Sequence, residues 1–191
     1  MAIETEKKFR LQEKQFNRLP ALLKKLGAIF EGEVFERNYL HRGRILSDRD
    51  AVLRLRKTGD RSILTYKESI GPEKALKQKI EFETEVADVD AMEEIIRKLG
   101  YRLAIVYEKR RRTWHMDNVE IVLDELPFGF YMEIEGTERA IIKAEKKLAI
   151  KRLVPEIRGY PKLTVRYGRM RKSVMEARFK RSNGKPSSSS R

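Results

Sequence analysis

The sequence contains no cysteine, and this absence removes several kinds of chemistry at once. Without thiols the chain has no disulfide, no thiolate-bound metal and no cysteine nucleophile. Histidine is almost as scarce, since His41 and His115 are the only two. We expect both to lie at the surface or at strand ends rather than to act as ligands or general bases. Any metal must therefore be held by oxygen or histidine.

A long hydrophobic run is also missing, so the sequence predicts no membrane-spanning helix. Its 191 residues are 38% charged and 40% hydrophobic, which fits one soluble domain with a substantial core. Met1-Ala2-Ile3 leads directly into charged residues, so we expect no secretory signal. The lack of cysteine agrees with a reducing cytoplasm. We therefore expect a cytoplasmic protein without membrane contact, and the oligomeric state stays open.

The net charge of +14 would ordinarily indicate a polyanionic partner, but it is concentrated at one end. Residues 166–191 contain nine Lys or Arg and the single acid Glu176. The last residues are mostly serine and basic, and they lack the apolar side chains needed to fold. We expect a folded domain at 1–171 and a flexible, solvated tail at 172–191. Nucleic acid would be contacted only through that tail.

Charged residues repeatedly share one face of a predicted strand. Glu4, Glu6 and Lys8 lie on one side, because successive side chains in a strand point to opposite faces, while Ile3 and Phe9 lie on the other. For a single strand this pattern is typical of a solvated sheet face. Here it recurs with both signs of charge, at Arg54/Arg56, Lys79/Glu81/Glu83/Glu85, Lys109/Arg111 and Glu133/Glu135. Together these strands indicate a charged interior.

The remaining pattern predicts strands with helices between them. Expected strands cover 28–40, 51–56, 62–68, 77–86, 103–114, 119–126 and 129–135, and expected helices cover 11–26, 88–99 and 137–153. Lys25-Leu26-Gly27 and Lys98-Leu99-Gly100 each end a helix and precede a long strand, which hints at two related halves. We predict an α+β fold: a closed antiparallel β-barrel of about eight strands that forms a charged tunnel, with helices packed outside.

A tunnel with one acidic and one basic wall suits a metal–polyphosphate complex. Carboxylates at i and i+2 of a strand point to the same side and can share a hard cation such as Mg²⁺ or Mn²⁺. Arg and Lys on the other wall neutralise phosphate oxygens. The metal polarises the terminal phosphoryl group while the cations stabilise the leaving phosphate.

Glu4-x-Glu6-x-Lys8 resembles the Glu-x-Glu-x-Lys signature of the CYTH superfamily, also called triphosphate tunnel metalloenzymes. That family includes class IV adenylyl cyclases, thiamine triphosphatases and inorganic triphosphatases. Later segments resemble the family in order, over residues 3–169: Leu53-Arg54-Leu55-Arg56, Thr65-Tyr66-Lys67, Glu81-Phe82-Glu83, Glu108-Lys109-Arg110-Arg111, Val122-Leu123-Asp124 and Met132-Glu133-Ile134-Glu135. Val165-Arg166-Tyr167-Gly168 resembles a family segment of Arg or Lys, then Ser, then Tyr, but the serine is missing.

The resemblance implies a role for each of these positions. Metal would be bound by Glu4, Glu6, Asp124, Glu133 and Glu135. The triphosphate would be bound by Lys8, Arg54, Arg56, Lys67, Lys79, Lys109, Arg111 and Arg166. Catalysis would fall chiefly to Glu4, Glu6, Lys8 and Asp124, while Glu81 and Glu83 would either orient cations or bind metal. The expected partner is a small molecule that contains a triphosphate.

Three activities remain open. The first is metal-dependent hydrolysis of inorganic tripolyphosphate or of an organic triphosphate such as thiamine triphosphate or a nucleoside triphosphate. The second is cyclisation of ATP to cyclic AMP and pyrophosphate. Bacterial relatives that resemble active cyclases have a His-Phe pair four residues before the signature, where this chain has Met1-Ala2-Ile3, so we expect hydrolysis. The third is a module that binds polyphosphate or RNA without turnover, which has little use for five metal-directed carboxylates.

Overall fold

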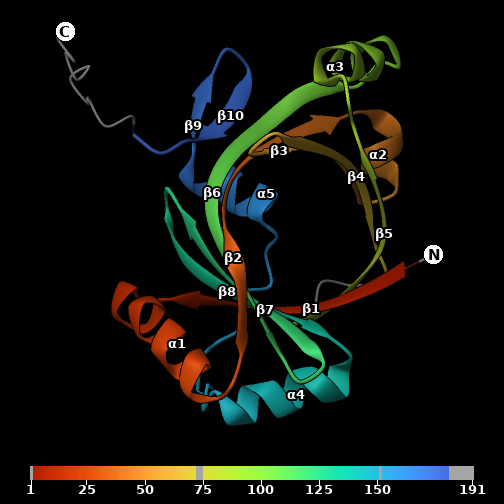
Figure 1. The fold of residues 1–191 in the computed structure, drawn as a ribbon. Helices are drawn as coiled ribbons and strands as arrows, with labels where there is room; N and C mark the ends of the chain where they lie inside the picture. The colour runs from red at the N-terminus through yellow and green to blue at the C-terminus, as the bar shows by residue number, and fades with distance from the viewer. Residues whose placement is uncertain (1, 72–74, 151, 181–191) are drawn as a thin grey trace, which may run out of the picture.

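The computed structural model describes residues 2–71, 75–150 and 152–180, and eight of its strands close into a barrel. The barrel strands are β1 (Ala2–Leu11), β2 (Ile29–Arg42), β3 (Ala51–Thr58), β4 (Arg61–Ser69), β5 (Leu76–Glu85), β6 (Arg102–Met116), β7 (Val119–Leu126) and β8 (Gly129–Gly136). Their order around the wall is β2-β3-β4-β5-β1-β8-β7-β6, and antiparallel pairing of β2 with β6 closes it. The predicted α+β barrel is confirmed (Figure 1).

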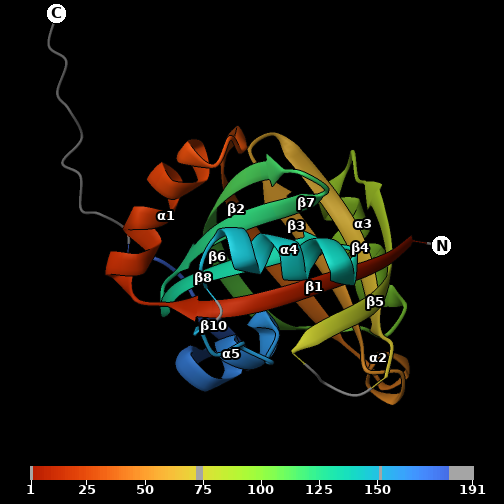
Figure 2. The same cartoon turned by 90° about the horizontal axis from the view of Figure 1, so that it is seen from below.

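The helices lie around this wall. They are α1 (Glu13–Lys25), α2 (Arg44–Asp48), α3 (Val89–Lys98), α4 (Glu138–Lys147) and α5 (Tyr160–Tyr167). Figure 2 shows α4 across the outer surface of the barrel and α5 and α2 at one end of it. Within the described residues, no helix is long and apolar enough to cross a membrane.

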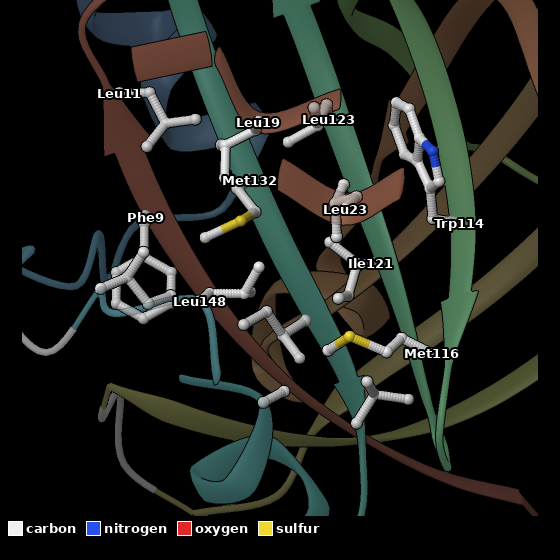
Figure 3. Packing of buried hydrophobic residues seen from close by; sticks show 14 of the residues in the cluster. Phe9, Leu11, Leu19, Leu23, Trp114, Met116, Ile121, Leu123, Met132 and Leu148 are labelled. Carbon is white, nitrogen blue, oxygen red and sulfur yellow. The ribbon is translucent and has the colours of Figure 1, made fainter. Parts of the chain in front are cut away.

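The main apolar core lies between the outer surface of the barrel and the helices (Figure 3). Phe9, Leu123 and Ile134 point outward from β1, β7 and β8, and they are almost fully buried against α1 and α4. Their neighbours Lys8, Asp124 and Glu133 occupy the opposite strand face, because side chains alternate along a strand. Packing the outer surface with helices therefore leaves the barrel interior to the charged residues.

The two Lys-Leu-Gly segments end helices as expected and lead into the closing strands. Gly27 and Gly100 have φ of +79° and +89°, a left-handed conformation that glycine adopts without a Cβ clash. β2 follows the first and β6 follows the second, and these two long strands pair with each other. Each half of the chain thus supplies one side of the closing seam.

The expected helix at 137–153 is too long, since α4 ends at Lys147. Ala149 has φ of +54°, which an α-helix does not allow. Leu148 and Ile150 still pack into the same core, and Leu153 packs against it. The apolar spacing therefore continues past the point where the helix stops, and this misled the sequence-based assignment.

Four short elements were not expected from the sequence. α2 and α5 were missed, as were β9 (Arg169–Arg171) and β10 (Val174–Ala177). β10 pairs in parallel with Ile105–Tyr107 of β6, on the edge that β7 leaves free, and β9 pairs with β10. The sheet therefore continues past the boundary expected at residue 171. The last residues of the expected tail, 181–191, lie outside the described residues.

The outer core gives a direct stability prediction. Leu23 on α1 is fully buried, and replacing it with alanine leaves a cavity, so Leu23→Ala should lower the free energy of unfolding by about 2–5 kcal/mol in urea denaturation. Leu99→Ala is the control, because Leu99 is 69% exposed and its loss should change that free energy by less than about 0.5 kcal/mol. Equal losses in both variants would contradict the location of the core.

Candidate active site

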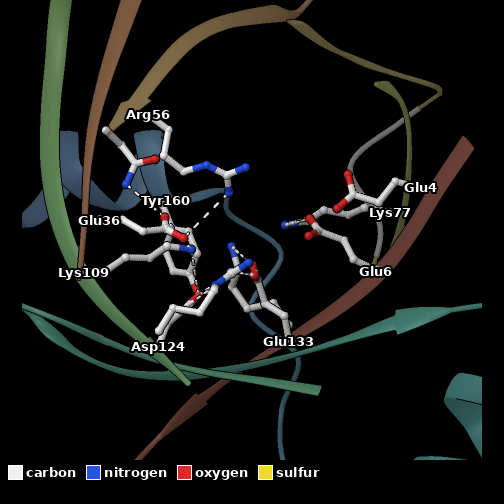
Figure 4. Close-up of polar contacts among 12 residues, drawn as sticks. Glu4, Glu6, Glu36, Arg56, Lys77, Lys109, Asp124, Glu133 and Tyr160 are labelled. Carbon is white, nitrogen blue, oxygen red and sulfur yellow. Dashed lines mark hydrogen bonds and ion pairs between the residues drawn. The ribbon is translucent and has the colours of Figure 1, made fainter. Parts of the chain in front are cut away.

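The barrel encloses a cavity of about 380 Å³ that is lined by charges of both signs. Every barrel strand except β2 contributes at least one charged side chain to the lining, and α5 closes part of it with Gly159, Tyr160, Pro161 and Lys162. Most of the site residues expected from the sequence line this cavity: Glu4, Glu6, Lys8, Arg54, Arg56, Lys67, Lys79, Glu81, Glu83, Lys109, Arg111, Glu133 and Glu135. The structure thus gathers them in one tunnel (Figure 4).

Strand register explains why these residues meet. Glu6 of β1 lies opposite Glu135 of β8 on one side and opposite Lys77 of β5 on the other. Lys8 lies opposite Glu133. Directly opposed residues of antiparallel strands point to the same face, so the register places these side chains together inside the barrel.

Three carboxylates form an acidic cluster at the β1–β8 seam. Glu4, Glu6 and Glu135 can each offer an oxygen atom, and these atoms lie within 4.8 Å of one another. Burial and the neighbouring charge of Glu4 raise the pKa of Glu135 to about 8. Such crowding of carboxylates is relieved by a divalent cation, and oxygen donors are the ligands that Mg²⁺ and Mn²⁺ prefer. The residues present therefore fit a metal of this kind.

Lysines of the neighbouring strands β4 and β5 pair with the acidic cluster. Lys67 Nζ donates to Glu4 Oε2 at 2.8 Å, and Lys79 Nζ donates to Glu6 Oε1 at 2.6 Å. Burial would raise the pKa of Glu4, but the charges of Lys67 and Lys79 and the hydrogen bonds of Glu81 and Lys67 together outweigh burial and hold that pKa at about 2. Lys67 also pairs with Glu81 at 2.7 Å, and burial together with a hydrogen bond to Glu4 raises the pKa of Glu81 to about 7. Glu81 thus extends the acidic side.

The basic wall is organised by two carboxylates. Glu83 accepts hydrogen bonds from Arg54 at 3.3 Å and Arg56 at 3.1 Å. Glu36 of β2 pairs with Lys109 at 3.3 Å and with Arg56 at 3.7 Å. Burial raises the pKa of Glu36, but the cations around it, Lys109 first, hold that pKa at about 2. Glu36 does not line the cavity and so braces the basic wall from behind.

Asp124 lies beneath the cavity rather than in its lining. Its side chain is fully buried, and Arg111 donates to both of its oxygens at 2.8 and 2.7 Å. Lys109 donates at 3.3 Å and the Tyr160 hydroxyl at 2.7 Å. Four donor contacts engage this carboxylate, and through them it supports the cations Arg111 and Lys109. Its expected metal-binding role stays a prediction.

Glu133 lines the cavity but is also engaged with cations. It pairs with Lys8 at 3.1 Å and accepts from Arg111 at 2.7 Å. Burial would raise the pKa of Glu133, and the positive charges around it, Lys8 first, hold that pKa well below the ordinary value. Glu133 therefore links the cations Lys8 and Arg111 beside the acidic cluster.

Arg166 is not brought into the tunnel. It lies exposed on α5, with its guanidinium 5.6 Å from the ring centre of Tyr167, and neither residue lines the cavity. Of the two tyrosines on α5, Tyr160 lines the cavity, and its ring lies 3.7 Å from Lys8 Nζ. Arg166 thus lies outside the cavity in which its phosphate-binding role was expected.

Residues of this site that sequence reasoning missed include Glu36, Lys77 and Tyr160. Lys77 carried a usable signal, because it stands two residues before Lys79 and so shares its strand face. Glu36 had a weaker one, since the strand around it contains several charged residues. The two histidines lie near the ends of β2 and β6, as expected, and His41 is buried whereas His115 is exposed.

Comparison with known proteins gives consistent matches. A family model described as CYTH domain matches residues 2–158. The chain is 29% identical over 151 residues to a putative adenylate cyclase of Methanocaldococcus jannaschii, over 76% of this chain and 83% of that protein. The solved PH1012 protein of Pyrococcus horikoshii OT3 is 26% identical with a TM-score of 0.74, over 84% of this chain and 98% of that one. A putative adenylyl cyclase from Hippeastrum shares the fold at 18% identity and a TM-score of 0.64, over 86% and 94%.

The position of Glu36 predicts a pH-dependent loss of stability. Its folded pKa of about 2 lies below the ordinary 4.5, so its contribution is complete above pH 4.5 and fades as the pH falls towards 2. Glu36→Gln should lower the free energy of unfolding by roughly 3 kcal/mol at pH 7 and by roughly half as much at pH 3. Urea denaturation of both proteins at several pH values measures this, and a difference independent of pH would contradict the pairing.

Proposed function

This chain belongs to the CYTH domain family, and on that premise we propose that it hydrolyses a triphosphate inside its barrel tunnel with the help of a divalent cation. The family binds triphosphate substrates, and its members include triphosphatases and adenylyl cyclase-like proteins. Its tunnel enzymes are metal-dependent in general.

One observation carries the proposal: a three-carboxylate cluster and an array of Arg and Lys share a single cavity. A protein that bound only an anion would gain nothing from Glu4, Glu6 and Glu135, because their negative charges repel phosphate. A protein that bound only a metal would have no use for Arg54 and Arg56. The combination suits a metal–triphosphate complex, in which both charges are present.

The residues then divide the work. Glu4, Glu6 and Glu135 would hold the cation, which when bound polarises the terminal phosphoryl group and lowers the pKa of an attacking water. Arg54 and Arg56 bind phosphate oxygens and stabilise the charge that develops on the leaving phosphate. The water oxygen forms a bond to the terminal phosphorus while the anhydride bond breaks, which releases orthophosphate. Glu83, Glu36 and Asp124 position the cations.

Hydrolysis is preferred over cyclisation on two grounds. The putative adenylyl cyclase from Hippeastrum, which shares the fold, has a dominant triphosphatase activity. Cyclisation also needs a ribose hydroxyl held against the α-phosphate, whereas hydrolysis needs only water, metal and a phosphate clamp. Adenylyl cyclase activity is the second candidate, and the name of the Methanocaldococcus jannaschii relative favours it.

The first prediction concerns activity and metal. The purified protein should release phosphate from at least one of tripolyphosphate, thiamine triphosphate, ATP and GTP when Mg²⁺ or Mn²⁺ is present, and excess EDTA should abolish the release. Cyclic AMP is measured in the same ATP reaction. Cyclic AMP as the main product would replace hydrolysis with cyclisation, and binding without either product would leave a binding module.

A second prediction separates the two walls. Glu135→Gln removes a metal-directed oxygen, so the metal concentration for half-maximal rate should rise at least roughly tenfold, with a lower kcat. Arg54→Met removes a phosphate contact, so kcat/KM should fall roughly ten- to a hundred-fold, chiefly through KM. Metal titrations and substrate titrations on folded variants measure both. Identical profiles in the two variants would contradict the division of roles.

A further inference from the structure

Lys77 differs from the other cations that the described barrel strands place in the cavity. Each of the others has a carboxylate oxygen within 3.3 Å: Lys8, Arg54, Arg56, Lys67, Lys79, Lys109 and Arg111. The nearest carboxylate to Lys77 Nζ is Glu6, at 3.8 Å, and this nitrogen makes no hydrogen bond. Arg54 and Arg56 each leave Nε without a partner but donate through a terminal nitrogen, so among the described strand cations of this lining Lys77 is the one whose charged group makes no hydrogen bond.

An ammonium that makes no hydrogen bond is unusual in a position as buried as that of Lys77. The side chain is only 10% exposed, and an ammonium removed from water without hydrogen-bond acceptors carries a large free-energy cost. Glu6 offsets this cost only in part, because its Oε1 lies 3.8 Å from Lys77 Nζ and already accepts from Lys79 at 2.6 Å. Lys8 and Lys79 add repulsion.

Lys77 also lies where its ammonium could bind an anion inside the cavity. It lines the cavity, opposite Glu6 across the β1–β5 pair, and so stands beside the acidic cluster. An oxygen of a phosphoryl group could accept from Lys77 while the same group faces the metal-binding carboxylates. Charge-assisted hydrogen bonds of this kind are roughly twice as strong as neutral ones.

We propose that Lys77 binds phosphate next to the acidic cluster of Glu4, Glu6 and Glu135. Its ammonium donates a hydrogen bond to the phosphoryl group that the bound metal ion would contact. This inference rests on the proposed function, since it takes a triphosphate as the occupant. It assigns to Lys77 a binding role that neither the charge pattern nor the family motif assigned. It also explains why the chain keeps a buried ammonium that lowers its own stability.

Binding of tripolyphosphate by isothermal titration, in EDTA so that turnover does not interfere, tests the assignment. Lys77→Met should weaken binding roughly ten- to a hundred-fold, and Lys77→Arg should restore most of it. Lys14→Met is the matched control, because Lys14 lies exposed on α1 outside the barrel, and its binding should equal that of the wild type.

Thermal unfolding without ligand distinguishes binding from a structural role. Removing an ammonium that repels Lys8 and has no hydrogen bond should leave the Tm of Lys77→Met equal to or above that of the wild type. A structural lysine would instead lower the Tm. Unchanged tripolyphosphate binding in Lys77→Met, or a lower Tm that accounts for the weaker binding, would overturn the inference.

The same data separate this inference from the proposed function. If the wild type binds tripolyphosphate and Lys77→Met does not, the assignment stands even when no phosphate is released from any substrate. If Lys77→Met binds and hydrolyses like the wild type, the assignment is wrong while hydrolysis stands. If the wild type itself shows no binding of tripolyphosphate, the phosphate-binding position at Lys77 is overturned.

Discussion

Mutual neutralisation of buried charges is the constraint on which this barrel depends. Asp124 is fully buried and accepts from Arg111, Lys109 and Tyr160, while Glu133 joins Arg111 to Lys8. Removing one member of such a set is costly, because it leaves its partner charged and unpaired in a medium that cannot solvate it. The paired charges therefore stabilise one another only when all of them are present, and their contacts fix the orientation of each side chain. Fixed orientation is what a site needs to bind a charged transition state without reorganising.

The position of the apolar core makes this arrangement possible. Leu23 of α1 and Ile141 of α4 pack on the outward faces of the strands, so hydrophobic burial is obtained outside the barrel. The inner faces are then free to be polar, and their pairing is complete except at a few points. Glu135 is crowded by like charges, and Lys77 makes no hydrogen bond. These two residues lie on either side of Glu6, and they are the positions where a cation and an anion respectively would relieve the imbalance.

The sequence was sufficient for features that depend on neighbours along the chain. Alternation of Glu4, Glu6 and Lys8 with apolar residues identified the inner face of β1, because strand geometry alone sets that periodicity. The left-handed glycines Gly27 and Gly100 could be expected from their place after helical segments. The charge pattern of the later strands then predicted a tunnel with walls of opposite sign, and the family resemblance placed most of the lining residues.

Features that depend on long-range pairing were decided by the tertiary structure. Asp124 and Glu133 both belong to acidic motifs, yet the register of β6 and β7 puts Asp124 opposite Arg111 and beneath the cavity. Two tyrosines stand at the two ends of α5, and packing sends Tyr160 inward while Tyr167 stays outside. Local sequence pattern thus determined which residues are charged and which strand face they share. Closure of the barrel by β2 and β6 determined which charges meet, because that pairing joins residues sixty or more positions apart.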